Sequence, residues 1–207
     1  MNLKSIKLET ENYLKSKGLE PNPNLPLIEN INEVSPRNAR DVASRMFAMS
    51  NLIGMGYGAK RSRLKKDLKT FQLWPFVTEA ERKNLNSFRL SEDIKVHYQW
   101  LCECCQALAW CLNLVEMDHF KRCDPDLSDK VPPKTDPSSF IEKATLRPMI
   151  DIQRQVDLLY RLHWNAKFRD RHMNVKNLNY NVIVERRRAI DWVYGLGKRW
   201  DDIALDT

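Results

Sequence analysis

The sequence has no apolar run long enough to cross a bilayer. Its longest apolar stretch, ALAWCLNLV at residues 107–115, is far shorter than the roughly 20 residues that a spanning helix needs. The start, MNLKSIKLETENYL, carries charged residues where a secretory signal peptide has an apolar segment. We therefore expect a cytoplasmic protein without a membrane partner.

Strand-like alternation of apolar and polar residues is also missing, and no internal repeat is visible. With 43% hydrophobic and 29% charged residues, the composition is that of a folded globular chain. In a chain of 207 residues, two separate domains would each be small. We therefore predict an all-α fold, with a single compact domain over residues 1–207 and about six to eight helices.

Cysteines are few, and motifs for metal binding or catalysis are absent. The five cysteines are an odd number, and four of them crowd one predicted helix, so we expect reduced thiols that serve as small apolar side chains. Residues 124–129, DPDLSD, lack the glycine of a calcium loop, and Cys102 and Cys105 have no second ligand pair at zinc spacing. No nucleophile motif or His-Glu-x-x-His pattern occurs. We predict no metal and no cofactor, and we favour a non-catalytic role.

Capping residues and apolar residues at helical spacing predict the helices. Ser91 caps a helix over residues 91–116 whose apolar stripe is wide enough for the middle of the domain. Ser35 is the expected cap of a helix that ends in GMGYG at 54–58, and TEAE at 78–81 is a capping box. The other helices are expected at residues 3–17, 148–172 and 181–196.

Two segments lack apolar residues at helical spacing. Residues 118–137 are rich in proline and aspartate, and we expect them to form a long loop. The chain closes on WDDIALDT, which joins an aromatic ring to three carboxylates. We expect residues 198–207 to pack back on the core as a clasp, with Trp200 buried and the carboxylates accepting hydrogen bonds from Arg161 or Arg186.

Charged side chains interrupt the apolar faces of the last two helices. His163 continues the apolar row of the helix from 148, and Asp157 and Arg161 are spaced to pair on one face. Arg186 shares the apolar row of the last helix, with Glu185 at its edge. Interior charges must be paired, because removing one partner of a buried pair costs about 3–5 kcal/mol. A structural network and a functional site look alike in sequence, so both interpretations stay open.

Positive charge is concentrated at residues 60–69, KRSRLKKDLK, where six basic residues and one acidic residue give a local charge of +5. Such a segment attracts nucleic acid, acidic proteins or lipid head groups. No aromatic ladder or base-reading motif accompanies it, so a solvated helix face is the favoured interpretation.

Several segments resemble a bacterial domain family of unknown function, DUF4272. They are VDLLYRLHWNAKF at 156–168, VIVERRRAIDWV at 182–193 and the terminal WDDIALDT, together with earlier segments that include LCECCQALAWCLNL at 101–114. The resemblance implies that Trp164 and Trp192 are among the characteristic positions of the family. It implies no known activity or cofactor. The predicted polar-centre residues are Asp157, Arg161, His163, Trp164, Glu185, Arg186, Trp200, Asp201, Asp202 and Asp206.

Three classes of function remain. We favour a protein-binding role, such as an immunity protein that neutralises a toxin, through Lys65, Lys66 and Lys69 or through Asp124, Asp126 and Asp129. The alternative is an enzyme that uses Arg161, His163, Glu185 and the aspartates. Nucleic-acid binding through residues 60–69 ranks third.

Overall fold

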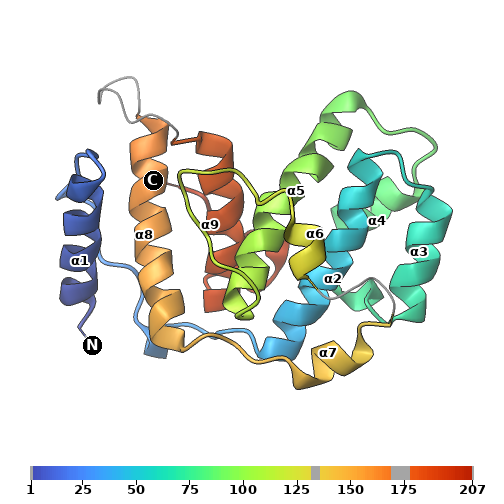
Figure 1. The fold of residues 1–207 in the computed structure, drawn as a ribbon, viewed down its shortest axis with the longest axis horizontal. Helices are drawn as coiled ribbons and strands as arrows, with labels where there is room; N and C mark the ends of the chain where they lie inside the picture. The colour runs from blue at the N-terminus through green and yellow to red at the C-terminus, as the bar shows by residue number, and fades with distance from the viewer. Residues whose placement is uncertain (1, 132–135, 169–177, 207) are drawn as a thin grey trace. The chain divides into compact units, whose positions relative to one another are not determined.

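The computed structural model describes residues 2–131, 136–168 and 178–206 (Figure 1). In these residues all regular secondary structure is helical, with nine α-helices and three short 3-10 helices. The all-α prediction is confirmed, and the number of helices is close to the predicted one. None of the helices in these ranges is long and apolar enough to cross a membrane.

The contacts between residues group the chain into two compact units. Unit 1 comprises residues 1–37, 118–122 and 147–207, and unit 2 comprises residues 38–117 and 123–146. The single domain over residues 1–207 stays a prediction.

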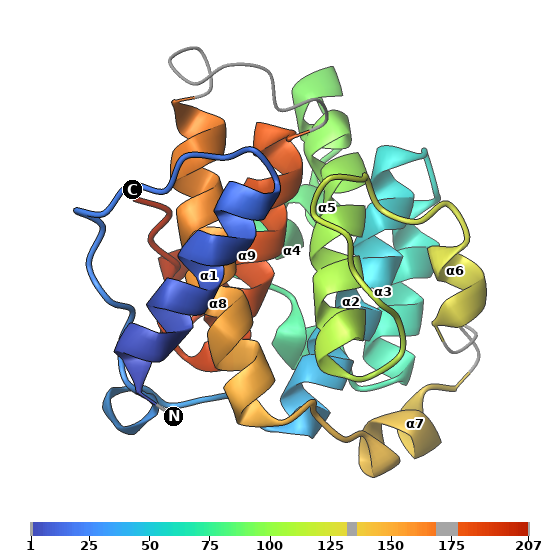
Figure 2. The same cartoon turned by 60° about the vertical axis from the view of Figure 1, so that its left-hand side comes forward.

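Unit 1 is built on three long helices, with α1 packed along α8 and α8 packed along α9 (Figures 1 and 2). Their buried faces are the apolar rows expected from the sequence, since Ile152, Val156 and Leu159 of α8 are almost fully buried. The elements are α1 (Leu3–Ser16), η1 (Ile31–Glu33), α8 (Met149–Lys167), α9 (Tyr180–Tyr194) and η4 (Trp200–Asp202).

Unit 2 is centred on α2 and α5, which lie side by side in both views (Figures 1 and 2). A buried ion pair ties α4 to α2, because the Nη1 and Nη2 groups of Arg45 donate to the Glu81 carboxylate at 2.8 and 2.7 Å. The elements are α2 (Ala39–Gly56), α3 (Arg61–Thr70), η2 (Trp74–Phe76), α4 (Glu79–Asn86), α5 (Glu92–Cys111), α6 (Leu127–Lys130) and α7 (Ser138–Lys143).

The helix starts follow local capping chemistry at two places and differ at a third. Ser91 caps α5, and Thr78 with Glu81 forms the predicted capping box of α4. The prediction that Ser35 caps the second helix is wrong, because Asn38 accepts the hydrogen bond from the main chain of α2. Residues 35–37 are instead held beside α9, where the main-chain N–H of Arg37 donates to the carbonyl of Val193 at 2.9 Å.

Two predicted segments are shorter or more structured than expected. Helix α5 ends at Cys111 and not at 116, because Asn113 takes a left-handed conformation (φ 60°) and the N–H of Leu114 bonds back to Ala109. The expected loop 118–137 contains α6, and its residues 132–135 lie outside the described ranges, as does the end of the predicted helix 148–172 beyond residue 168.

Candidate functional site: the buried charges of unit 1

The Asp157–Arg161 pair in α8 is almost completely buried, and each side chain is 1% exposed. The guanidinium Nε donates to both carboxylate oxygens at 3.1 and 3.0 Å, and Nη2 donates to Oδ1 at 2.9 Å. Nη2 also donates to the main-chain carbonyl of Pro26 at 3.1 Å. The pair therefore fastens the extended segment around residue 26 to α8.

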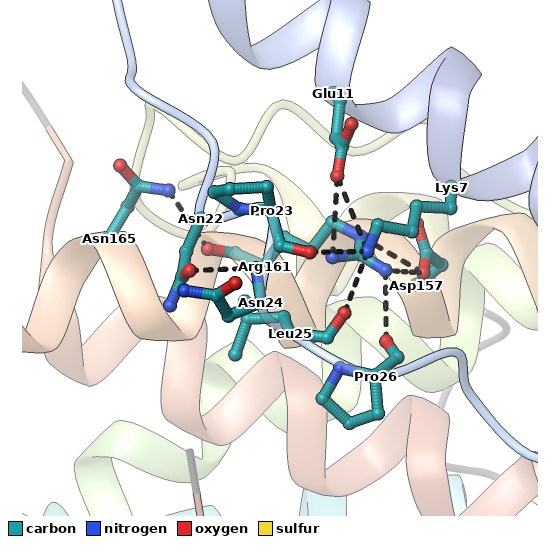
Figure 3. Close-up of polar contacts among 10 residues, drawn as sticks. All are labelled: Lys7, Glu11, Asn22, Pro23, Asn24, Leu25, Pro26, Asp157, Arg161 and Asn165. Atoms are coloured by element: carbon teal, nitrogen blue, oxygen red, sulfur yellow. Dashed lines mark hydrogen bonds and ion pairs between the residues drawn. The ribbon is translucent and has the colours of Figure 1, made fainter.

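Helix α1 joins the same network (Figure 3). Glu11 lies 3.9 Å from Nη1 of Arg161, and Lys7 donates to the carbonyls of Pro23 and Leu25, both at 2.8 Å. Figure 3 shows these side chains of α1 reaching toward Arg161 from above the extended segment. All of these contacts are internal, which is what a structural role for Arg161 requires.

Arg186 is fully buried and also holds main chain. Its Nη1 donates to the carbonyl of Asp118 at 2.7 Å, and its Nη2 donates to that of Lys121 at 3.0 Å. The neighbouring Glu185 instead accepts from Arg188 at 3.0 Å. Adjacent residues of α9 therefore serve different partners. Arg161, expected to pair with a C-terminal carboxylate, is instead bonded to Asp157.

A second buried network links α8, α9 and the C-terminal segment through Arg187. Its Nη1 lies 2.6 Å from Nδ1 of His163 and donates to the main-chain carbonyl of Asp206 at 3.1 Å. Its Nε donates to Oδ2 of Asp191 at 3.1 Å. Burial, followed by the charges of Arg187 and Lys167, lowers the pKa of His163 to about 4, so the imidazole is neutral and its Nδ1 can accept from Arg187.

Asp191 has an unusual environment for a carboxyl group. It is 1% exposed, and its Oδ1 has no hydrogen-bond partner among the described residues. Burial raises the pKa of Asp191 to about 7, although the charge of Arg187 and its hydrogen bond act in the opposite direction. A carboxyl group with such a pKa changes its charge near neutral pH, which is a common property of functional sites.

A pocket of about 440 Å³ opens beside this carboxyl group. Its polar lining comes from Glu29, Tyr160, Arg187, Asp191 and Asp206. Its apolar lining comes from Pro26, Leu27, Ile28, Val156, Leu196 and Ala204. The volume is in the range of small-molecule sites.

The C-terminal residues have divided roles. Trp200 is buried and meets Trp192 edge to face, with ring centroids 5.5 Å apart. Asp201 and Asp202 are exposed, and Asp202 accepts from Arg199. Trp164 is half-buried and packs against Phe168.

Four of the polar residues that line the pocket were not predicted from the sequence: Glu29, Tyr160, Arg187 and Asp191. A signal was present, because Arg187 and Asp191 have the same four-residue spacing that identified Asp157 and Arg161. Of the predicted polar centre, the structure brings His163 and Asp206 together through Arg187, whereas Arg161 and Glu185 belong to separate pairs.

The predicted partner-binding residues all lie in unit 2. Lys66 and Lys69 are exposed on α3, and Lys65 donates to the side chain of Asn86. Asp126 and Asp129 are exposed, whereas Asp124 is engaged by Lys130 and by the N–H of Asp126.

The cysteines of unit 2 are thiols and not disulfides. Cys104, Cys105 and Cys111 are buried, whereas Cys102 and Cys123 are half-buried at a pocket of about 400 Å³. Hydrogen bonding with Cys102, followed by burial, raises the pKa of Cys123 well above its ordinary value. Such a thiol is a poor nucleophile. Among the described residues, no group of three or more His, Cys, Asp or Glu side chains is arranged to hold a metal ion.

Comparison with known protein families identifies a match. The profile of a family described as "Domain of unknown function (DUF4272)" matches residues 6–203. No curated protein and no solved structure is detectably similar to the chain.

Proposed function

The chain belongs to the DUF4272 family, and we propose that it is a non-catalytic protein-binding domain whose contact surface lies on unit 2. The observation that carries this proposal is Phe88, whose side chain is 100% exposed. Arg61, at the start of α3, donates to the carbonyl of Phe88 at 2.7 Å. The main chain that carries a fully exposed aromatic ring is therefore bonded to the start of the basic segment at residues 60–69.

This combination suits a partner with an acidic surface. Aromatic and arginine side chains contribute most of the binding energy in many interfaces, and surrounding charges accelerate association. Tyr57, which is 72% exposed, precedes α3 by a few residues and extends the aromatic character. The finer proposal is that the partner is a toxin whose active site the domain covers, as an immunity protein of bacterial antagonism in the cytoplasm.

The enzyme alternative has weaker support. It would use Arg161, His163 and Glu185, yet these side chains are engaged with Asp157, Arg187 and Arg188, respectively. General acid–base catalysis needs such groups within reach of one reacting atom.

The test is to purify tagged chain from the source cells and compare the recovered proteins with those of variants. We expect Phe88→Ser, and separately Lys65→Glu with Lys66→Glu and Lys69→Glu, to lose a partner that the wild type retains. Charge reversal should act mainly on the association rate and depend on salt. Leu8→Ser is the matched control, because Leu8 of α1 is also exposed, at 59%.

Two results would contradict the proposal. One is that all variants retain every protein that the wild type recovers while their melting temperatures are unchanged. The other is that the basic variant loses nucleic acid, with binding that falls steeply with salt, and no protein. Reversal of Asp124, Asp126 and Asp129 tests the alternative acidic surface in the same assay.

A further inference from the structure

The pocket beside Asp191 has features of a ligand site and lies wholly within unit 1. Its walls come from the extended segment at Pro26–Glu29, from α8, from α9 and from the C-terminal segment. Pro26, which Figure 3 shows below Arg161, belongs to both the Arg161 network and the pocket wall. The buried pairs described above therefore fix this wall in place.

The charges at the pocket are unbalanced. Among the described residues, three carboxyl groups line it, those of Glu29, Asp191 and Asp206, against one guanidinium, that of Arg187. The Nε and Nη1 groups of that guanidinium are already engaged by Asp191, His163 and the Asp206 carbonyl. The pocket therefore favours a positively charged occupant.

Asp191 supplies a specific acceptor for that occupant. Its Oδ2 accepts from Arg187, whereas its Oδ1 is buried and has no hydrogen-bond partner. Buried polar atoms are nearly always hydrogen-bonded, so an unpaired acceptor on a residue that lines the pocket is suited to a donor bound there. The apolar side chains of Leu27, Val156 and Leu196 suit a carbon chain next to the donor.

We propose that this pocket binds a small aliphatic amine as its ammonium ion, which donates to Oδ1 of Asp191 while Glu29 and Asp206 contribute negative charge. The ring of Tyr160, whose face already lies 5.0 Å from the guanidinium carbon of Arg187, borders the same space. This site does not depend on the protein-binding role proposed for unit 2.

Proton linkage follows from the groups that face Asp191. These are Arg187 on α9, Glu29 on the extended segment and, beyond Arg187, His163 on α8 and the C-terminal Asp206. The carboxyl group has a pKa of about 7, so it is partly protonated at neutral pH. A bound ammonium ion stabilises the ionised form, so its binding releases a proton and is tighter at about pH 8 than at about pH 6.

The experiment is isothermal titration of the full chain with n-butylammonium and with n-butanol, its neutral counterpart. Titrations at about pH 8 and about pH 6, in buffers of different ionisation enthalpy, count the protons released. We expect the ammonium ion to bind and the alcohol not to bind. Asp191→Asn should lower the affinity by about tenfold or more, since a charge-assisted hydrogen bond is lost.

Asp191 also contacts Arg187, so a second set of variants tests the site without touching that pair. Glu29→Gln and Asp206→Asn change exposed side chains and keep the main-chain carbonyl that Arg187 uses. Each should weaken binding of n-butylammonium severalfold. Asp201→Asn, an exposed carboxylate of the same segment that is not part of the pocket lining, should leave it unchanged.

The proposal is overturned if n-butylammonium does not bind at about pH 8, where Asp191 is ionised. Equal binding of n-butanol would overturn it as well, since charge would then be irrelevant. So would an unchanged affinity in the Glu29→Gln, Asp206→Asn double variant.

Discussion

At the scale of single residues, the described part of unit 1 contains two buried Arg–Asp pairs with the same four-residue spacing. They differ in whether both oxygens of the carboxylate are hydrogen-bonded. Arg161 and Asp157 share three hydrogen bonds, and a main-chain carbonyl takes a further donor. Arg187 binds Asp191 through Oδ2 and leaves Oδ1 without a hydrogen bond among the described residues. The first pair is therefore suited to holding the fold, and the second has capacity for a ligand.

The Arg161 pair should be a large contributor to stability. We expect Arg161→Ala to lower the free energy of unfolding by about 3–5 kcal/mol, because Asp157 would keep a buried charge without its partner. Urea denaturation at neutral pH measures the loss. Arg199→Ala is the control, because Arg199 is 78% exposed in its pair with Asp202 and such pairs contribute about 1 kcal/mol or less. Equal losses in both variants would mean that the burial of Arg161 is unimportant.

His163 should make the protein less stable in acid. Its pKa is about 4 in the folded protein and about 6.5 in the unfolded chain. Between these values the unfolded chain binds a proton that the folded protein does not, so acidification costs about 1.4 kcal/mol per pH unit. Asp191 has the opposite effect on the pH dependence of stability. Its pKa is raised to about 7, so below that pH the folded protein holds a proton that the unfolded chain has released, and acidification stabilises the fold.

The measurement compares urea denaturation of the wild type and of His163→Asn from about pH 6.5 to about pH 4. The difference between the two proteins isolates His163, and we expect the free energy of unfolding of the wild type, relative to that of the variant, to fall toward acid. His97→Asn, at an exposed position of α5, should keep the wild-type decline. Parallel curves for the wild type and His163→Asn would contradict the prediction.

The sequence predicts which residues interrupt the apolar rows better than it predicts what they contact. His163 and Arg186 were identified because they stand at core positions of their helices, and both are fully buried. Arg187 and Asp191 were overlooked because residues 186–188 are three consecutive arginines. Which of them turns inward depends on the packing of α8 and the C-terminal segment, which lie far from them in sequence.

At the scale of elements, three of the described helices are followed by a glycine in a left-handed conformation, and two of these glycines, Gly18 and Gly195, have different surroundings. Gly18 follows α1 with φ 73°, and a Cβ there would meet nothing within 4 Å. Gly195 follows α9 with φ 95°, and a Cβ there would lie 2.3 Å from the carbonyl oxygen of Ser35. The end of α9 is thus fitted closely against the segment that precedes α2.

Alanine substitution at the two glycines should lower the stability of the protein by different amounts. Gly18→Ala should cost about 1–2 kcal/mol, the strain of a left-handed residue with a side chain. Gly195→Ala should cost clearly more, because the Ser35 main chain must also move. Thermal and urea denaturation of both variants provide the comparison. Similar losses would show that the contact with Ser35 yields easily.

Local sequence predicted the starts of helices that have a side-chain cap nearby. The other helix starts depend on contacts with distant segments. Ser91 and the Thr78–Glu81 box mark helix starts without help from other segments. The start of α2 was misplaced because the hydrogen bond from Arg37 to Val193 of α9 holds residues 35–37 outside the helix, a contact that no local pattern reveals. The six-residue helix α7 has no side-chain cap and was missed for that reason.

At the scale of the whole molecule, the last residues complete unit 1. Removing residues 199–207 takes away Trp200 and the carbonyl of Asp206 that accepts from Arg187. We expect a loss of several kcal/mol, of which burying one large aromatic side chain contributes roughly 3–5 kcal/mol. The melting temperature should fall accordingly. The Asp201→Asn, Asp202→Asn double variant, which changes exposed residues only, should melt near the wild type, and an unchanged melting temperature of the truncated chain would refute the clasp.

The division of unit 1 into chain segments also has a consequence for biosynthesis. Helix α1 leaves the ribosome before α8 and α9, which are made more than a hundred residues later. Helix α1 packs on α8, and residues 35–37 lie against α9. At typical elongation rates of about 5–20 residues per second, α1 waits roughly seven seconds or more for α8. All of unit 2 is translated in that interval. During this time the apolar face of α1 is exposed to chaperones, and a ribosome that stalls before α8 leaves a nascent chain with that face uncovered.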